Sequence, residues 1–197
     1  MTMKPIPGYT HGTAVVARSP VSLAEFELLK RTVLFGSDDV RALQRSAGIL
    51  ADQTDAILDV WYGFVGSNSH LLQFFGHPKS GEPQGDYLAA VRQRFGRWIL
   101  DTANANYDQA WLDYQHEIGL RHHRMKKNRT DGATAADHVS FRYLSALLVP
   151  ITTTLKPFLS KQGTPPAEVE AMHAAWVKSV LLQTILWSHP YVKAGDF

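Results

Sequence analysis

The stretch that decides the fold is YDQAWLDYQHEIGLRHHRMKKN, residues 107–128. Its apolar and aromatic side chains recur at spacings of four, three and four, at Tyr107, Trp111, Tyr114 and Ile118. Residues three and four apart lie on one face of an α-helix, so the pattern predicts a helix over this stretch with one buried stripe. Asn106 is expected to cap it, because Gln109 stands three residues later in the capping-box position.

His122 extends the buried stripe, because it follows Ile118 by four residues. The next residue, His123, is rotated by about 100° around the helix and falls in line with His116 and Leu120, nearer the polar side. A buried imidazole needs a partner for its ring nitrogen, and an iron ion is one such partner. The alternative is a core histidine bonded to a backbone carbonyl, and helical spacing is compatible with both.

The stretch runs into a basic segment, RHHRMKKNR, residues 121–129. Cations are favoured near a helix C-terminus, and the formal net charge of the chain is only +2. The segment therefore predicts a solvated helix end rather than a nucleic-acid interface, and no nucleic-acid partner is expected. A further interpretation is that one or two of these bases meet the carboxylates of a bound ligand.

Composition limits the chemistry that is available. The 197 residues are 45% hydrophobic and 19% charged, which predicts one ordered domain over residues 1–197, with residues 1–20 as an N-terminal extension. The chain has no cysteine, which excludes disulfides, thiolate nucleophiles, iron–sulfur clusters and covalent attachment of haem through CxxCH. Any metal must therefore be held by histidine, carboxylate or tyrosine.

Helical periodicity dominates the whole chain and predicts an all-α fold of roughly seven helices. Beyond residues 107–128, helices are expected over residues 21–34 from a capping box at Ser22 and Glu25, 38–64 with a bend near Gly48, 87–100, 136–159 with a kink at Pro150, and 166–188. The first helix is expected to end at Gly36, and residues 76–85 are expected to form a loop.

Neither export nor a membrane segment is expected from the sequence. The N-terminus carries prolines and a glycine where a signal peptide needs an apolar run, which predicts a cytoplasmic protein. The most apolar stretch, residues 176–187, is shorter than the roughly 20 residues that span a bilayer.

The consecutive aromatics Trp61 and Tyr62 form a second candidate site feature. A buried tyrosine normally needs a partner for its hydroxyl, so Tyr62 could point into a cavity, and Gly63 and Gly66 would allow another group to approach closely. The alternative is ordinary aromatic packing at a helix end.

Six segments of the chain resemble protoglobins, the single-domain archaeal and bacterial globins related to the haem domains of globin-coupled sensors. They are IPGYTHG, ILDVWYGFVGS, YLAAVRQRFGRWILDT, YDQAWLDYQHEIGLRHHRMKKN, PITTTLKPFL and WSHPYVKAGDF. The resemblance extends from about Ile6 to Phe197. It implies a globin-like helical sandwich with an additional N-terminal helix, here residues 21–34.

The resemblance also implies a buried haem b (iron protoporphyrin IX) with His122 as the iron ligand. On the gas-binding side it implies Trp61 and Tyr62 together with Phe95, and Tyr62 would donate a hydrogen bond to bound dioxygen. Leu147 stands where the family carries a further phenylalanine, which is a departure that would alter the volume of the pocket.

The implied function is reversible binding of the diatomic gases O2, CO and NO, as a carrier, scavenger or sensor. One alternative is a haem enzyme with NO dioxygenase, nitrite reductase or peroxidase-like activity, although no dedicated enzymatic feature is visible. Another is a cofactor-free helical interaction module that binds through residues 121–129. The resemblance further implies a homodimer formed by the outer faces of residues 136–159 and 166–188.

Overall fold

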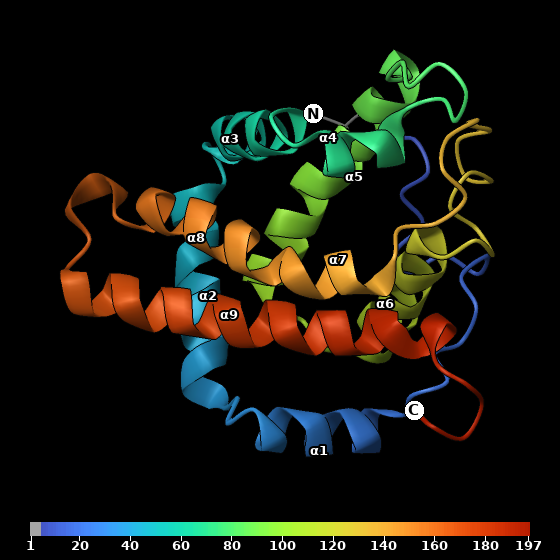
Figure 1. The fold of residues 1–197 in the computed structure, drawn as a ribbon. Helices are drawn as coiled ribbons and strands as arrows, with labels where there is room; N and C mark the ends of the chain where they lie inside the picture. Colours follow the sequence, from blue (N-terminus) through green and yellow to red (C-terminus); the bar gives the residue numbers. More distant parts are fainter. Residues whose placement is uncertain (1–4) are drawn as a thin grey trace.

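The computed structural model describes residues 5–197, and in this range it contains nine α-helices and three short 3-10 turns (Figure 1). The helices are α1 (Leu23–Thr32), α2 (Ser37–Leu50), α3 (Thr54–Gly66), α4 (Ser69–Leu72), α5 (Gly85–Asn104), α6 (Gln109–His122), α7 (Phe141–Ala146), α8 (Leu148–Leu159) and α9 (Pro166–Ser188). The only β-pairing among these residues is an isolated bridge between Gly76 and Pro83. The all-α prediction is confirmed, while residues 1–4 of the predicted N-terminal extension lie outside the described range.

Helix α9 is the central element of the fold. It contacts α2, α5, α6, α7 and α8, and it runs antiparallel to α8 across one face of the molecule (Figure 1). Helix α1 lies along the outer edge, where Phe26 packs against Tyr107 and Trp111 at the start of α6. The predicted capping box of α1 is present, because Ser22 and Glu25 each accept a hydrogen bond from the other's backbone N–H. This local signal is confirmed, although the helix ends before Gly36, at Thr32.

The predicted helix over residues 38–64 is two helices. Gly48 lies inside α2, and the break falls at residues 51–53, so the predicted position of the bend was wrong by a few residues. The side chain of Gln53 is buried at this break and donates a hydrogen bond to the backbone carbonyl of Phe158 at 3.3 Å. A contact with a distant part of the chain therefore accompanies the break, and helical periodicity cannot register such a contact.

Helix α6 begins later and ends earlier than predicted. Its cap is Asp108 rather than Asn106, because the Asp108 carboxylate accepts the Trp111 N–H at 2.8 Å. The helix ends at His122, and residues 123–132 form turns instead of continuing it. The basic segment is therefore not a solvated helix end, and part of it folds back onto the protein.

The predicted kink in residues 136–159 is a break between α7 and α8 at Leu147. Pro150 lies in the first turn of α8, where its missing N–H removes no helical hydrogen bond. A proline ring clashes with the carbonyl group four residues before it, which belongs here to Ala146, the last residue of α7. The predicted position of the kink was therefore wrong by a few residues, and so was the predicted start of the helix, because residues 136–140 are not helical. The break places Leu147 at the joint between α7 and α8.

Gly119 allows α6 to approach α9 closely. A Cβ atom at this position would lie 3.0 Å from the Cα and 3.1 Å from the carbonyl oxygen of Trp187. Both are backbone atoms, which cannot move aside by a change of rotamer.

Gly119→Ala is therefore expected to lower the free energy of unfolding by about 1–3 kcal/mol, because the two helices must separate. The matched control is Gly48→Ala in α2, where no atom lies within 4 Å of the added Cβ. This control is expected to gain about 0.4–1 kcal/mol from the reduced entropy of the unfolded chain. Urea unfolding followed by circular dichroism compares the two, and equal effects would contradict the role of Gly119.

None of the helices in residues 5–197 has an apolar stretch long enough to cross a membrane.

Candidate functional site

The buried apolar side chains of the protein form two clusters. The larger one joins α1, α2, α3, α5, α6, α8 and α9, and the smaller one consists of Trp61, Val65, Leu71, Phe74, Val139 and Leu144. A cavity of about 230 Å³ is lined by side chains from both clusters. A single water molecule needs only about 10–15 Å³ of such space, so the cavity can accommodate a ligand of many atoms.

The structure brings all five residues proposed from the sequence to this one cavity. Its lining includes Trp61 and Tyr62 from α3, Phe95 from α5, His122 from α6, and Leu147 between α7 and α8. The walls are mostly apolar and aromatic, as is typical of small-molecule sites. His123 does not line the cavity, and its ring instead packs against Tyr191 with centroids 4.9 Å apart.

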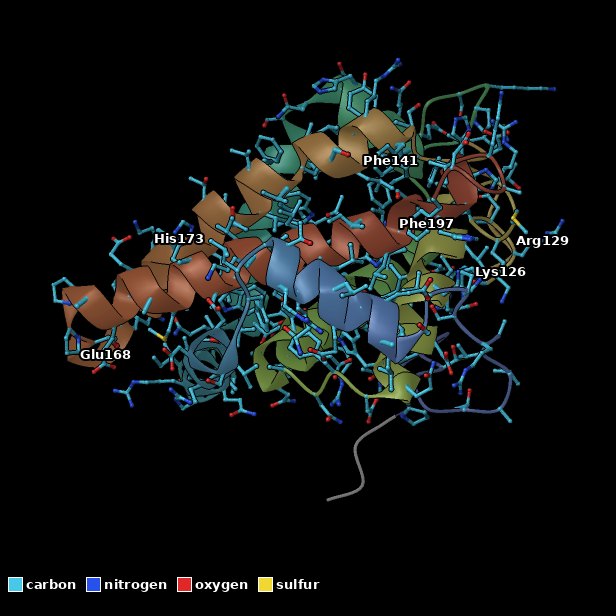
Figure 2. The ribbon with its side chains drawn as sticks, turned by 90° about the horizontal axis from the view of Figure 1, so that it is seen from below. Lys126, Arg129, Phe141, Glu168, His173 and Phe197 are labelled. Carbon is cyan, nitrogen blue, oxygen red and sulfur yellow. The ribbon has the colours of Figure 1, made fainter. Side chains whose placement is uncertain are left out.

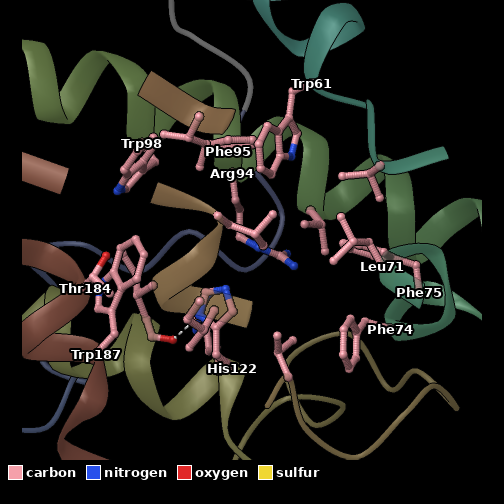
Figure 3. A pocket seen from close by; sticks show the side chains of 18 of the residues that line it. Trp61, Leu71, Phe74, Phe75, Arg94, Phe95, Trp98, His122, Thr184 and Trp187 are labelled. Carbon is pink, nitrogen blue, oxygen red and sulfur yellow. Dashed lines mark hydrogen bonds between the residues drawn. The ribbon is translucent and has the colours of Figure 1, made fainter. Parts of the chain in front are cut away.

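The His122 ring is held on one edge and on one face. Its Nδ1 lies 2.9 Å from the carbonyl oxygen of Ile118, so Nδ1–H is the donor and Nε2 keeps its lone pair (Figure 3). Its face stacks on Trp187, with ring centroids 5.6 Å apart and planes inclined by 22°. Burial lowers the pKa of His122, which favours the neutral form. The result is an oriented, neutral imidazole whose Nε2 has no hydrogen-bond partner among the described residues.

Trp187 is a site residue that the sequence did not reveal. Its indole Nε1 donates to the Gln115 side-chain oxygen at 2.9 Å, which ties α9 to α6 and fixes the ring beside His122. The absence of a Cβ at Gly119 brings the Trp187 backbone close to α6. The sequence shows that Trp187 belongs to an apolar stretch of α9 but not which residue it touches, so only the packing of two helices identifies it.

Trp61 and Phe95 form another part of the cavity wall. They meet edge to face with centroids 5.7 Å apart, and Trp61 lies across the cavity from His122 (Figure 3). These rings come from α3 and α5, whereas His122 comes from α6. The cavity is therefore enclosed between different helices, with the free imidazole nitrogen on one of its sides.

Tyr62 also lines the cavity, and its hydroxyl forms no hydrogen bond with any described residue. Burial raises the pKa of this hydroxyl, so it stays protonated and can act as a neutral donor. Its ring packs against Phe75, with centroids 6.5 Å apart. No described residue takes up the room at Gly63 and Gly66, because nothing lies within 4 Å of a Cβ built at either position.

Three cationic side chains, Arg94, Arg121 and Lys127, also line the cavity. Arg94 comes from α5 and points into the cavity in Figure 3. The basic segment was expected to be solvated, and this expectation was wrong for Arg121 and Lys127, which line the cavity. The turn after His122 carries Lys127 back to the cavity, whereas Lys126 and Arg129 lie at the outer edge of the molecule (Figure 2).

Comparisons with known proteins bear on this fold and cavity. The model of the protoglobin family matches residues 22–197. Among solved structures, the globin domain of the Geobacter sulfurreducens globin-coupled sensor is similar, with a TM-score of 0.64 and 14% sequence identity over 85% of this chain and 97% of that domain. No curated protein sequence matches the chain. The structural likeness shows the globin fold, and the family match covers all nine helices of the described residues; the chain belongs to the protoglobin family.

Proposed function

We propose that this protein binds haem b in the cavity, with His122 as the iron ligand, and that it reversibly holds diatomic gases there as a carrier, scavenger or sensor. The observation that carries the proposal is the state of His122. The ring is neutral, Nδ1 is engaged by the carbonyl of Ile118, and Nε2 is unbonded in the wall of a large apolar cavity. A metal-ligating histidine typically has its second nitrogen fixed in this way.

The other residues of the cavity fit haem as well. In residues 5–197, no three His, Asp or Glu side chains come together to hold a metal ion. A single histidine would suit a metal whose other ligands come from a porphyrin. The apolar walls suit the macrocycle, and the three cations among the lining residues suit its carboxylates.

When bound, haem supplies a ferrous centre with an open coordination position for O2, CO or NO. The protein supplies the surroundings of that position. The Tyr62 hydroxyl is a free neutral donor in an apolar environment, where a hydrogen bond to a polarised ligand is stronger than in water. Trp61 and Phe95 pack against each other, limit the space and exclude water.

Leu147 occupies the joint between α7 and α8 in the lining of the same cavity. The family pattern implies a phenylalanine here, and leucine fills less of the cavity. We therefore propose that this protein has a roomier gas-binding side than that pattern implies. The homodimer remains a prediction for the outer faces of α8 and α9, on which Val149 and Leu181 are exposed.

A haemin titration of the purified protein tests the proposed function. We expect the absorption change to saturate at one haemin per chain, and the reduced complex to respond to CO with a saturable spectral shift. Absence of a stoichiometric break, or a reduced complex whose spectrum CO leaves unaltered, would remove the proposal. Free haemin in the same buffer is the control, because it shows the spectrum of haem without a defined protein ligand.

A further inference from the structure

Lys127 carries a buried positive charge that the protein leaves without a carboxylate partner. Its side chain lines the cavity, and the residue is only 4% exposed. Its Nζ donates one hydrogen bond, to the backbone carbonyl of Phe74 at 2.8 Å, and lies 5.4 Å from the centre of the Tyr87 ring. An ammonium group has three donors, so two remain available.

The other two cations of the cavity are already paired. Arg94 forms a bidentate pair with Asp131, at 2.8 and 2.6 Å, and Arg121 contacts Glu117 at 2.9 Å. For Lys127, no carboxylate of the described residues lies within 4.0 Å. A buried charge is costly to maintain unless it is paired, so this site lacks an anion.

The backbone holds Lys127 close to His122. The N–H of Lys127 donates to the carbonyl of His123 at 3.0 Å, in the turn that directly follows α6. One short segment therefore carries both the free imidazole nitrogen and the unpaired ammonium group. Because the two groups share this segment, a ligand with a metal centre and a peripheral carboxylate could engage both.

We propose that Lys127 binds a carboxylate of the ligand held in the cavity, and that for haem this carboxylate is a propionate. Arg94 and Arg121 line the same cavity and add to the positive potential that favours the anion. Their contribution to this potential is smaller than that of Lys127, because each is partly neutralised by its own carboxylate partner. The inference rests on the proposed function, and it assigns the direct contact with the carboxylate to Lys127, the residue of the basic segment that lines the cavity without a carboxylate partner of its own.

The matched control lies next to it in the sequence. Lys126 carries the same charge, but its Nζ pairs with Glu117 at 2.7 Å and it does not line the cavity. Lys126→Met and Lys127→Met therefore remove the same group from adjacent positions. Only the second removes a cation from the cavity wall.

The experiment compares haemin with haemin dimethyl ester, whose carboxylates are blocked. Each porphyrin is loaded into the wild type and both variants, and its transfer to an excess of an acceptor protein is followed by absorbance. We expect Lys127→Met to release haemin about tenfold or more faster, since a hydrogen bond to a charged group is lost. The release of the ester should change little, so the rate of ester release divided by the rate of haemin release should fall only in Lys127→Met.

Lys127→Arg keeps a cation at the position and should retain the discrimination between acid and ester. If Lys127→Met does not discriminate between the porphyrins but accelerates the release of both equally, the inference is wrong. In that case Lys127 only stabilises the segment around Phe74 through its hydrogen bond to the Phe74 carbonyl. Equal retention of acid and ester by the wild type would overturn it as well. A wild type that binds neither porphyrin would overturn the proposed function itself, which is a different result.

Discussion

His122→Ala is expected to release haem at least about 100-fold faster than the wild type, because the side chain supplies the only protein ligand that we propose for the iron. Removing a group that only hydrogen-bonds to a metal ligand already weakens metal binding by about 10–100-fold. Removing the ligand itself should have a larger effect. The rate is measured by transfer of haem to an excess of an acceptor protein, starting from a freshly reconstituted complex.

His123→Ala is the control, because this ring lies outside the cavity lining and packs on Tyr191. It should release haem at the rate of the wild type. Added imidazole should restore the wild-type spectrum of His122→Ala by occupying the space of the missing ring, which a folding defect would not allow. Haem retention by His122→Ala at the wild-type rate and with an unchanged spectrum would disprove the assignment.

Tyr62→Phe is expected to raise the O2 dissociation rate by about 10–100-fold. O2 draws more electron density from ferrous iron than CO does, so a hydroxyl donor stabilises O2 selectively, and a hydrogen bond to a charged group contributes about 1.5–3 kcal/mol. The CO dissociation rate should change by less than about threefold, because CO is a weaker acceptor. Stopped-flow displacement of each gas from the ferrous protein measures both rates.

Tyr87→Phe is the matched control for this prediction. Tyr87 is also a buried tyrosine of the same cavity, and burial raises its pKa to about 12, so it too is a neutral hydroxyl. If the O2 rate rises in Tyr87→Phe and not in Tyr62→Phe, the donor has been assigned to the wrong tyrosine. An equal rise in both O2 and CO rates for Tyr62→Phe would indicate a change of access rather than a lost hydrogen bond.

The sequence alone determined features that depend on neighbours along the chain. Ser22 and Glu25 cap α1 because each reaches the other's backbone within a single turn. The spacing of Trp111, Tyr114 and His122 placed these side chains on one buried face because a helix repeats every 3.6 residues. These signals were sufficient for the helical class and for preferring His122 to His123.

Only the tertiary structure decided which atoms meet at the cavity. It ended α6 at His122 and stacked that ring on Trp187 from α9. It also buried Lys127, whose Nζ donates a hydrogen bond to the Phe74 carbonyl, although the basic segment was expected to be solvated. The physical reason is that such contacts join residues far apart in the chain, and their geometry depends on how closely whole helices pack. Periodicity identifies a buried face, but it carries no information about the partner of that face.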